Sequence, residues 1–179
     1  MRGGRHPGYG TANRIVPLGD CYLELVTVAD EAEAARSPFG SWVARSLSGR
    51  GRLLGWAVRT DELDDVARRL DLAITAGSRA TGGGETLRWR VAGIEHAAAE
   101  PSLPFFIEWA PGTPLPGHAP ARHPAGAVRV AELRLDGDAD RVHDWLGAER
   151  LPITVRTGPP APAGIVLAGP AGEIVVDQL

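Results

Sequence analysis

One feature constrains the fold most: a strand-like run, a short amphipathic helix and further strand-like runs follow one another, and the same order then recurs. Short runs separated by turn residues form small sheets rather than a helical bundle. The sequence therefore predicts an α+β protein of βαβββ-type modules with curved mixed sheets around a pocket. The expected elements are strands Leu53–Thr60, Thr86–Ala92, Pro104–Ala110, Ala127–Leu135, Leu151–Arg156, Gly164–Ala168 and Glu173–Val176 and helices Asp61–Leu70 and Asp138–Leu146.

The first helix rests on the spacing of its apolar residues. Leu63, Val66, Ala67 and Leu70 fall at i, i+3, i+4 and i+7, which places them on one helical face. Acidic residues crowd the first turn, where they favour the positive end of the helix dipole. We expect this helix, and the later one, to pack on the outer faces of the sheets.

The N-terminal region contains only part of a module. Asn13–Leu18 and Cys21–Val28 are apolar or alternating runs joined by the turn residues Gly19 and Asp20, so they predict a hairpin. We expect a glycine-rich loop before the hairpin and a loop with a short helix over Asp30–Ser48. The strand and helix that should precede the hairpin are missing, so either the gene start is misplaced or the protein functions without them.

We interpret residues 1–179 as a single domain. A proline-rich stretch with five of the fifteen prolines separates its last two units. The expected parts are a truncated first module at 1–30, a second module at 52–110, the linker at 111–126 and a third βαββ unit at 127–177.

Composition excludes several functional classes. The net charge of −3 argues against a nucleic-acid partner, and no apolar run approaches the roughly 20 residues that span a membrane. A signal-peptide core is also absent, which predicts a cytoplasmic protein. All 19 basic residues are arginine, which excludes Schiff-base chemistry and a phosphate-loop lysine. The single cysteine, Cys21, excludes an internal disulfide.

Two glutamates are candidate catalytic residues. Glu24 shares a strand face with Tyr22, and Glu108 shares one with Phe106. A carboxylate on an apolar strand is costly unless it is paired or ligated, so both predict contact with a metal or a substrate. The alternative is that each pairs with one of the many arginines.

Histidines and polar residues near the first hairpin extend this candidate site. His6, expected in the glycine-rich loop, is a catalytic candidate, and His123 is a substrate-binding candidate. Thr11 and Asn13 can hydrogen-bond a substrate or cap the turn that enters the first strand. For each histidine the alternative is a solvated side chain.

Aromatic residues complete the list of substrate-binding candidates. Trp56, Trp89 and Trp109 lie on three different expected strands and can line a pocket together with Tyr22. Packing in the core alone is the favoured explanation of the three tryptophans, because such large side chains bury area wherever they fall.

Six segments in their order along the chain carry a resemblance to a known family: Gly3–Asn13, Tyr22–Leu25, Leu54–Ala57, Leu87–Arg90, Pro104–Trp109 and His123-Pro124. Together they cover most of the chain and resemble the glyoxalase-like domain family of the vicinal oxygen chelate superfamily. One departure is that the family usually begins with a strand carrying Asp-His and then a helix.

The resemblance implies a cupped sheet that encloses a pocket, often with a divalent metal held by the first and last strands of two modules. Glu24 and Glu108 then resemble the acidic positions of the last strands. The histidine of the first strand falls in the missing segment, and Trp56 lies near the corresponding place in the second module, where it cannot bind a metal. We therefore expect no tightly bound divalent metal in this chain, although a divalent metal ion is possible because the superfamily often uses one.

Two functional hypotheses remain open. The first is an enzyme that acts on a small oxygenated metabolite by lyase, isomerase or dioxygenase chemistry. The second is a non-catalytic protein of the same fold that binds or sequesters a small molecule. Because the missing strand leaves a sheet edge uncovered, we also expect a homodimer.

Overall fold

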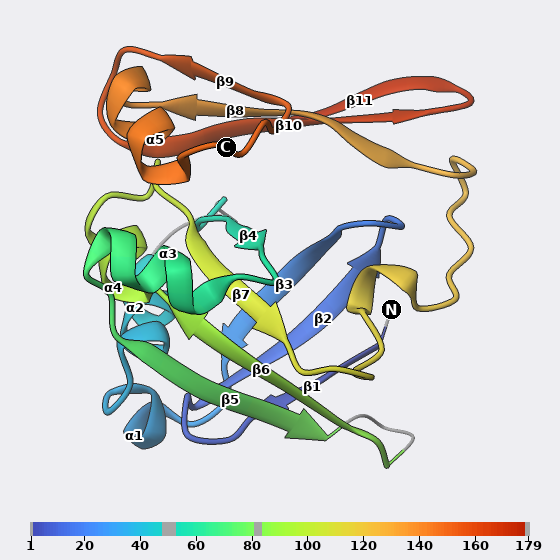
Figure 1. Ribbon diagram of the computed structural model, residues 1–179. Coiled ribbons are helices and arrows are strands. Elements are labelled where there is room, and N and C mark those ends of the chain that lie inside the picture. The colour runs from blue at the N-terminus through green and yellow to red at the C-terminus, as the bar shows by residue number, and fades with distance from the viewer. Residues whose placement is uncertain (1, 48–52, 81–83, 178–179) are drawn as a thin grey trace.

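The computed structural model describes residues 2–47, 53–80 and 84–177 (Figure 1). Over these residues the chain is a mixed α+β fold with one three-stranded and two four-stranded sheets. We call them sheet A (β1-β2-β3), sheet B (β4-β7-β6-β5) and sheet C (β11-β10-β8-β9), in the order of their hydrogen-bonded neighbours. This agrees with the fold class that the sequence predicts.

Sheet A is an antiparallel meander of β1 (Arg2–His6), β2 (Thr11–Pro17) and β3 (Tyr22–Val28). The expected hairpin is confirmed as β2 and β3. The expectation of a loop before it is wrong, because β1 pairs with β2 along its whole length. A Cβ atom on Gly3 would lie 1.9 Å from the Asn13 carbonyl oxygen, so only glycine allows this close approach.

Two short helices follow sheet A. They are α1 (Glu31–Ala34) and α2 (Pro38–Ser46). Their N-cap residues are Asp30 and Ser37, whose side chains accept hydrogen bonds from backbone N–H groups of the first turn. The sequence predicted a loop with a short helix here. Part of that prediction, Ser48, lies outside the described residues.

Sheet B contains β4 (Ala57–Arg59), β5 (Ile74–Ala80), β6 (Thr86–Ala92) and β7 (Phe105–Trp109), with β4 parallel to β7. Helix α3 (Leu63–Leu70) lies where the apolar spacing predicts it. The first strand is shorter than expected.

Two elements of this region were not expected. They are β5 and the helix α4 (Ile94–Ala99), which precedes β7. Neither element carries a clear apolar periodicity. Most side chains of β5 are exposed, and half of the residues of α4 are alanine.

Sheet C contains β8 (Arg129–Asp136), β9 (Ile153–Arg156), β10 (Ala161–Gly169) and β11 (Gly172–Asp177). Helix α5 (Ala139–Leu146) connects the parallel neighbours β8 and β9. The proline-rich stretch before β8 includes a short 3₁₀ helix, η1 (Pro116–His118). The strand and helix order predicted for this unit is therefore present.

Two apolar cores hold the sheets together. The larger core joins the outer face of sheet B to α3, α5 and sheet C, and Phe106, Leu63, Leu135 and Trp145 are among its buried members. A smaller one joins the β2–β3 end of sheet A to β10 of sheet C. Figure 1 shows sheet C lying across sheets A and B, with the β10–β11 hairpin projecting beyond them. The other faces of sheets A and B are left to form the site.

Sheets A and B share a topology apart from one strand. In sheet B the meander β5-β6-β7 carries β4 at its outer edge, whereas the described residues place no strand beside β3 at the corresponding edge of sheet A. Leu25 on β3 is 56% exposed. No described helix is long and apolar enough to cross a membrane.

Candidate functional site

A cavity of about 560 Å³, counted with its opening to solvent, lies between sheets A and B. Strand alternation explains which side chains face it. Asn13 and Ile15 on β2 and Tyr22 and Glu24 on β3 share the inner face of sheet A. The whole lining comprises His6, Tyr9, Asn13, Ile15, Tyr22, Glu24, Phe39, Arg79, Trp89, Val91, Ile94, Phe105, Ile107, Trp109 and Pro116.

Glu24 is the carboxylate of this cavity. Its Oε1 accepts a hydrogen bond from Nδ2 of Asn13 at 3.0 Å and lies 3.9 Å from Nε2 of His6. The side chain is 29% exposed, because it borders the cavity, yet protein surrounds it closely enough that burial raises its carboxyl pKa. A carboxyl group of this kind can exchange a proton with a ligand at a pH closer to neutrality than an ordinary glutamate can.

Asn13 fixes the position of Glu24. It is buried, and besides donating to Glu24 it accepts a hydrogen bond from the backbone N–H of Gly4 at 3.0 Å. The side chain thus connects β1, β2 and β3. Positioning of the carboxylate is a third role, beside the substrate hydrogen bonding and turn capping that the sequence left open.

His6 lies at the end of β1 rather than in a loop, and only 7% of the residue is exposed. Its Nδ1 is 2.9 Å from the hydroxyl oxygen of Thr11, the residue opposite it on β2. Burial and the positive charge of Arg79 lower the pKa of His6 to about 4. At neutral pH His6 is therefore an uncharged ring beside Glu24.

Arg79 on β5 is a cavity residue that the sequence did not indicate. It is the one buried residue of its strand, with 7% exposed. Burial lowers the pKa of its guanidinium, and the negative charge of Glu24 only partly offsets this effect. The sequence feature that could have predicted β5, and with it Arg79, is the β-branched pair Ile74 and Thr75, which is typical of a strand.

Aromatic rings form the wall on the side of sheet B. Trp89 on β6 and Trp109 on β7 are opposite each other in the register, with ring centroids 5.5 Å apart. Trp89 also meets the His6 ring edge to face at 6.0 Å. Tyr9 and Phe39, which the sequence did not single out, add two further rings to the wall.

Trp56 lies outside the cavity. Its indole N–H donates to the Ser102 carbonyl oxygen at 3.1 Å, and its ring packs against the larger core. Of the three candidate tryptophans, the structure brings two together and uses the third for packing.

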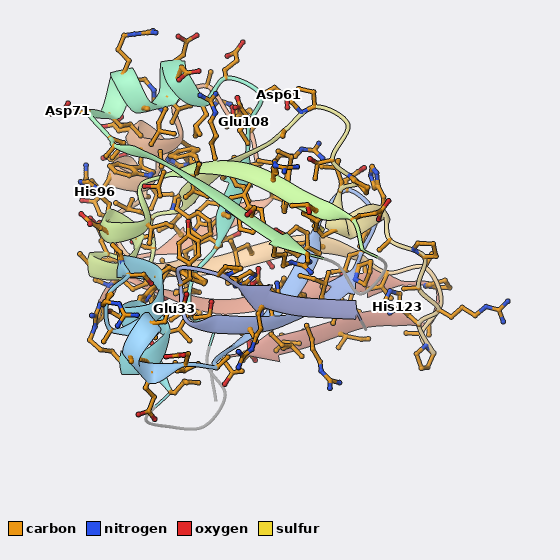
Figure 2. All side chains as sticks on the ribbon, turned by 90° about the horizontal axis from the view of Figure 1, so that it is seen from below. Glu33, Asp61, Asp71, His96, Glu108 and His123 are labelled. Atoms are coloured by element: carbon orange, nitrogen blue, oxygen red, sulfur yellow. The ribbon has the colours of Figure 1, made fainter. Side chains whose placement is uncertain are left out.

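Glu108 also lies outside the cavity. It shares the outer face of sheet B with Phe106, where it forms an ion pair with Arg90 and accepts a hydrogen bond from the backbone N–H of Leu63 at the start of α3. Figure 2 shows Glu108 near Asp61, at the α3 end of the molecule. The arginine pairing, considered as the alternative from the sequence, is therefore what the structure contains.

His123 belongs to a different region from the cavity. It is in the proline-rich stretch, where its Nε2 donates to the Pro17 carbonyl oxygen at 2.7 Å. Figure 2 shows its position far from Glu108. This hydrogen bond attaches the stretch to the end of β2 and leaves His123 out of the site.

The side chains around His6 do not fit a typical catalytic divalent site. Such a site takes about three protein ligands, whereas the described part of the chain gathers no group of three histidine, cysteine or acidic residues. His6 and Glu24 provide two donors at most. The guanidinium of Arg79 acts on both and would repel a cation.

Comparison with known proteins agrees with this architecture. Residues 1–150 match a family model described as a glyoxalase-like domain. The chain is also similar in structure to a hypothetical protein from Staphylococcus aureus, with a TM-score of 0.62 and 13% identity over 99% of this chain and 76% of that one. An identity this low shows the fold alone. No curated protein matches the sequence significantly.

Proposed function

The chain belongs to the glyoxalase-like domain family of the vicinal oxygen chelate superfamily, and from this premise we propose that the cavity binds a small oxygenated metabolite and that Glu24 transfers a proton to or from it. One observation carries the proposal. A carboxyl group with a raised pKa is held by an amide donor inside a cavity whose other walls are mainly aromatic and aliphatic.

Each neighbour of Glu24 has a distinct part in this proposal. Asn13 directs the carboxylate oxygen that it contacts, so that the other oxygen is free to meet the ligand. His6, uncharged at neutral pH, avoids forming a permanent ion pair that would keep Glu24 ionised. The hydroxyl of Tyr22, whose pKa is raised by burial, stays protonated and can donate to a ligand oxygen that becomes negative.

Isomerase or lyase chemistry suits these residues best. Both reactions can proceed by moving a proton from a carbon beside a carbonyl group, which a positioned carboxylate can do. Dioxygenase chemistry usually draws on a redox metal, for which the described residues do not provide three ligands in one place. We therefore propose an enzyme that has no tightly bound divalent metal.

A non-catalytic binding protein is the second candidate, and one observation favours it. The rings of Trp89 and Trp109, which meet edge to face, give the cavity an apolar wall against which a ligand can pack without any reaction. In this alternative Glu24 would only accept a hydrogen bond from the ligand.

Exchange of carbon-bound hydrogen with solvent separates the two candidates. Small ketones such as hydroxyacetone, incubated with the protein in D₂O, should exchange the hydrogens next to the carbonyl group, as followed by NMR. Glu24→Gln should reduce the rate at least about a hundredfold, in the range typical of a lost general base. Glu173→Gln, on the exposed strand β11, is the matched control. Binding of ketones without exchange in the wild type would favour the binding protein.

We also propose a cytoplasmic homodimer. Two surfaces can be covered by a second copy. One is the edge of β3, beside which the described residues place no strand and where Leu25 is exposed. The other is the exposed run of Ile174, Val175 and Val176 on the edge strand β11. Sedimentation over a range of concentrations tests the assembly. A monomer at high concentration would contradict it.

A further inference from the structure

Arg79 occupies an unusual position for a charged residue. Its side chain runs from β5 toward sheet A and passes over Gly4 of β1, where an added Cβ atom would lie 3.1 Å from Nη1 and 3.5 Å from Cδ. The side chain reaches the cavity that Glu24 lines. The other residues of β5 are exposed or half-buried, so this arginine alone is directed inward.

Within residues 2–47, 53–80 and 84–177 the guanidinium has no direct partner. Among the described residues it makes no hydrogen bond, and no carboxylate oxygen lies within the 4.0 Å of an ion pair. Arg90 on the neighbouring strand contrasts with it, because Arg90 binds the carboxylates of both Asp64 and Glu108. The charge of Glu24 acts on Arg79 without a direct contact between the two side chains.

A buried and unpaired guanidinium is unfavourable until an anion joins it. Its five N–H donors form a planar fork that matches a carboxylate in two parallel hydrogen bonds. A single arginine suits a monoanion. A phosphate dianion would carry more negative charge than one arginine balances, and Glu24 on the facing wall would repel it.

The remaining walls indicate the body of this anion. Trp89, Trp109 and Phe39 are flat and apolar, and they border the same cavity as Arg79. Rings of this kind stack on an aromatic or other flat group. We propose that Arg79 is the anion-recognition residue of the cavity and that the ligand is a small carboxylate with a flat apolar body.

This inference deepens the proposed function, since it names the ligand class of the same cavity, but it does not require proton transfer by Glu24. An anion held at Arg79 would also lie near Glu24 and would favour the protonated carboxyl. The carboxylate of the ligand thus serves for recognition by Arg79, and any reaction would take place at another part of the ligand.

Phenylacetate and phenylacetamide test the inference, because they share a shape and differ in charge. Binding can be followed by tryptophan fluorescence, since Trp89 and Trp109 line the cavity. We expect the wild type to bind phenylacetate at least tenfold more tightly. Arg79→Met should abolish this preference while still binding phenylacetamide, and Arg79→Lys should keep part of it. Arg88→Met, at an exposed position of β6, should change nothing.

Three results would overturn the inference. They are wild-type protein that binds neither probe, wild-type protein that binds both equally, and an Arg79→Met variant that folds and retains the preference. Tighter binding of benzyl phosphate than of phenylacetate would contradict the choice of a carboxylate. The comparison of probes in the wild type decides the matter even if Arg79→Met fails to fold. Glu24→Gln should still prefer phenylacetate, so failure of the proton-transfer proposal is seen separately.

Discussion

Replacement of Asn13 by alanine tests how the cavity is held together. The change removes the donor to Glu24 and the acceptor of the Gly4 N–H, both at 3.0 Å, from a side chain that is 8% exposed. A hydrogen bond contributes roughly 1 kcal/mol, and a buried group left unsatisfied costs about 1–3 kcal/mol. We therefore expect Asn13→Ala to lower the free energy of unfolding by about 2–3 kcal/mol.

Urea denaturation measures this loss directly. For a chain of this length, 1 kcal/mol corresponds to roughly 2–4 °C in Tm, so Tm should fall by about 4–12 °C. Arg14→Ala, one residue further along β2 and exposed, is the control and should change the free energy of unfolding by less than about 0.5 kcal/mol.

The same variant should also change the titration of Glu24. The Asn13 donor lowers the pKa of the Glu24 carboxyl, while burial raises it. Removal of the donor therefore raises the pKa further, and the pH profile of any Glu24-dependent exchange should move toward alkaline pH. The reasoning would be refuted by a variant as stable as Arg14→Ala with an unchanged profile.

Three further predictions concern His6, Glu108 and the metal content of the protein. Burial and Arg79 lower the pKa of His6 to about 4 from an ordinary 6.5, so below pH 6.5 the unfolded chain binds the proton first. The free energy of unfolding should fall by up to about 3 kcal/mol as the pH drops to 4, and His6→Gln should flatten this dependence in denaturant titrations. Glu108→Gln should weaken the first turn of α3 and lower Tm by about 2–4 °C, with ketone exchange unchanged. Elemental analysis of protein purified without chelator should find well under one divalent metal per chain, and stoichiometric metal that is lost in Glu24→Ala would contradict this.

Local signals in the sequence predicted much of the secondary structure. The β2–β3 hairpin follows from two apolar runs around Gly19, whose positive φ suits the turn. Helices α3 and α5 follow from apolar spacing and from acidic residues in their first turns. These signals work because the geometry of a turn or a helix depends on residues within a few positions of one another.

Strand β1 and strand β5 depend on partners that are distant in sequence. β1 is rich in glycine and becomes a strand because β2 lies close enough to need glycine there. β5 exposes most of its side chains and is held by pairing with β6. Local sequence patterns therefore did not predict either strand. Because β5 was not predicted, Arg79 was not recognised as a cavity residue.

Glu24 and Glu108 show most clearly what the sequence determines and what only the tertiary structure determines. The sequence alone determined that Glu24 and Glu108 each stand on an apolar face of a strand, because side chains alternate with a period of two. It could not determine what covers that face. Packing of α3 and α5 on the outer side of sheet B places Glu108 with Arg90, whereas the inner face of sheet A turns Glu24 into the cavity. Alternation is a property of one strand, and the environment of a face is a property of how whole sheets pack, so only the tertiary structure separates the two carboxylates.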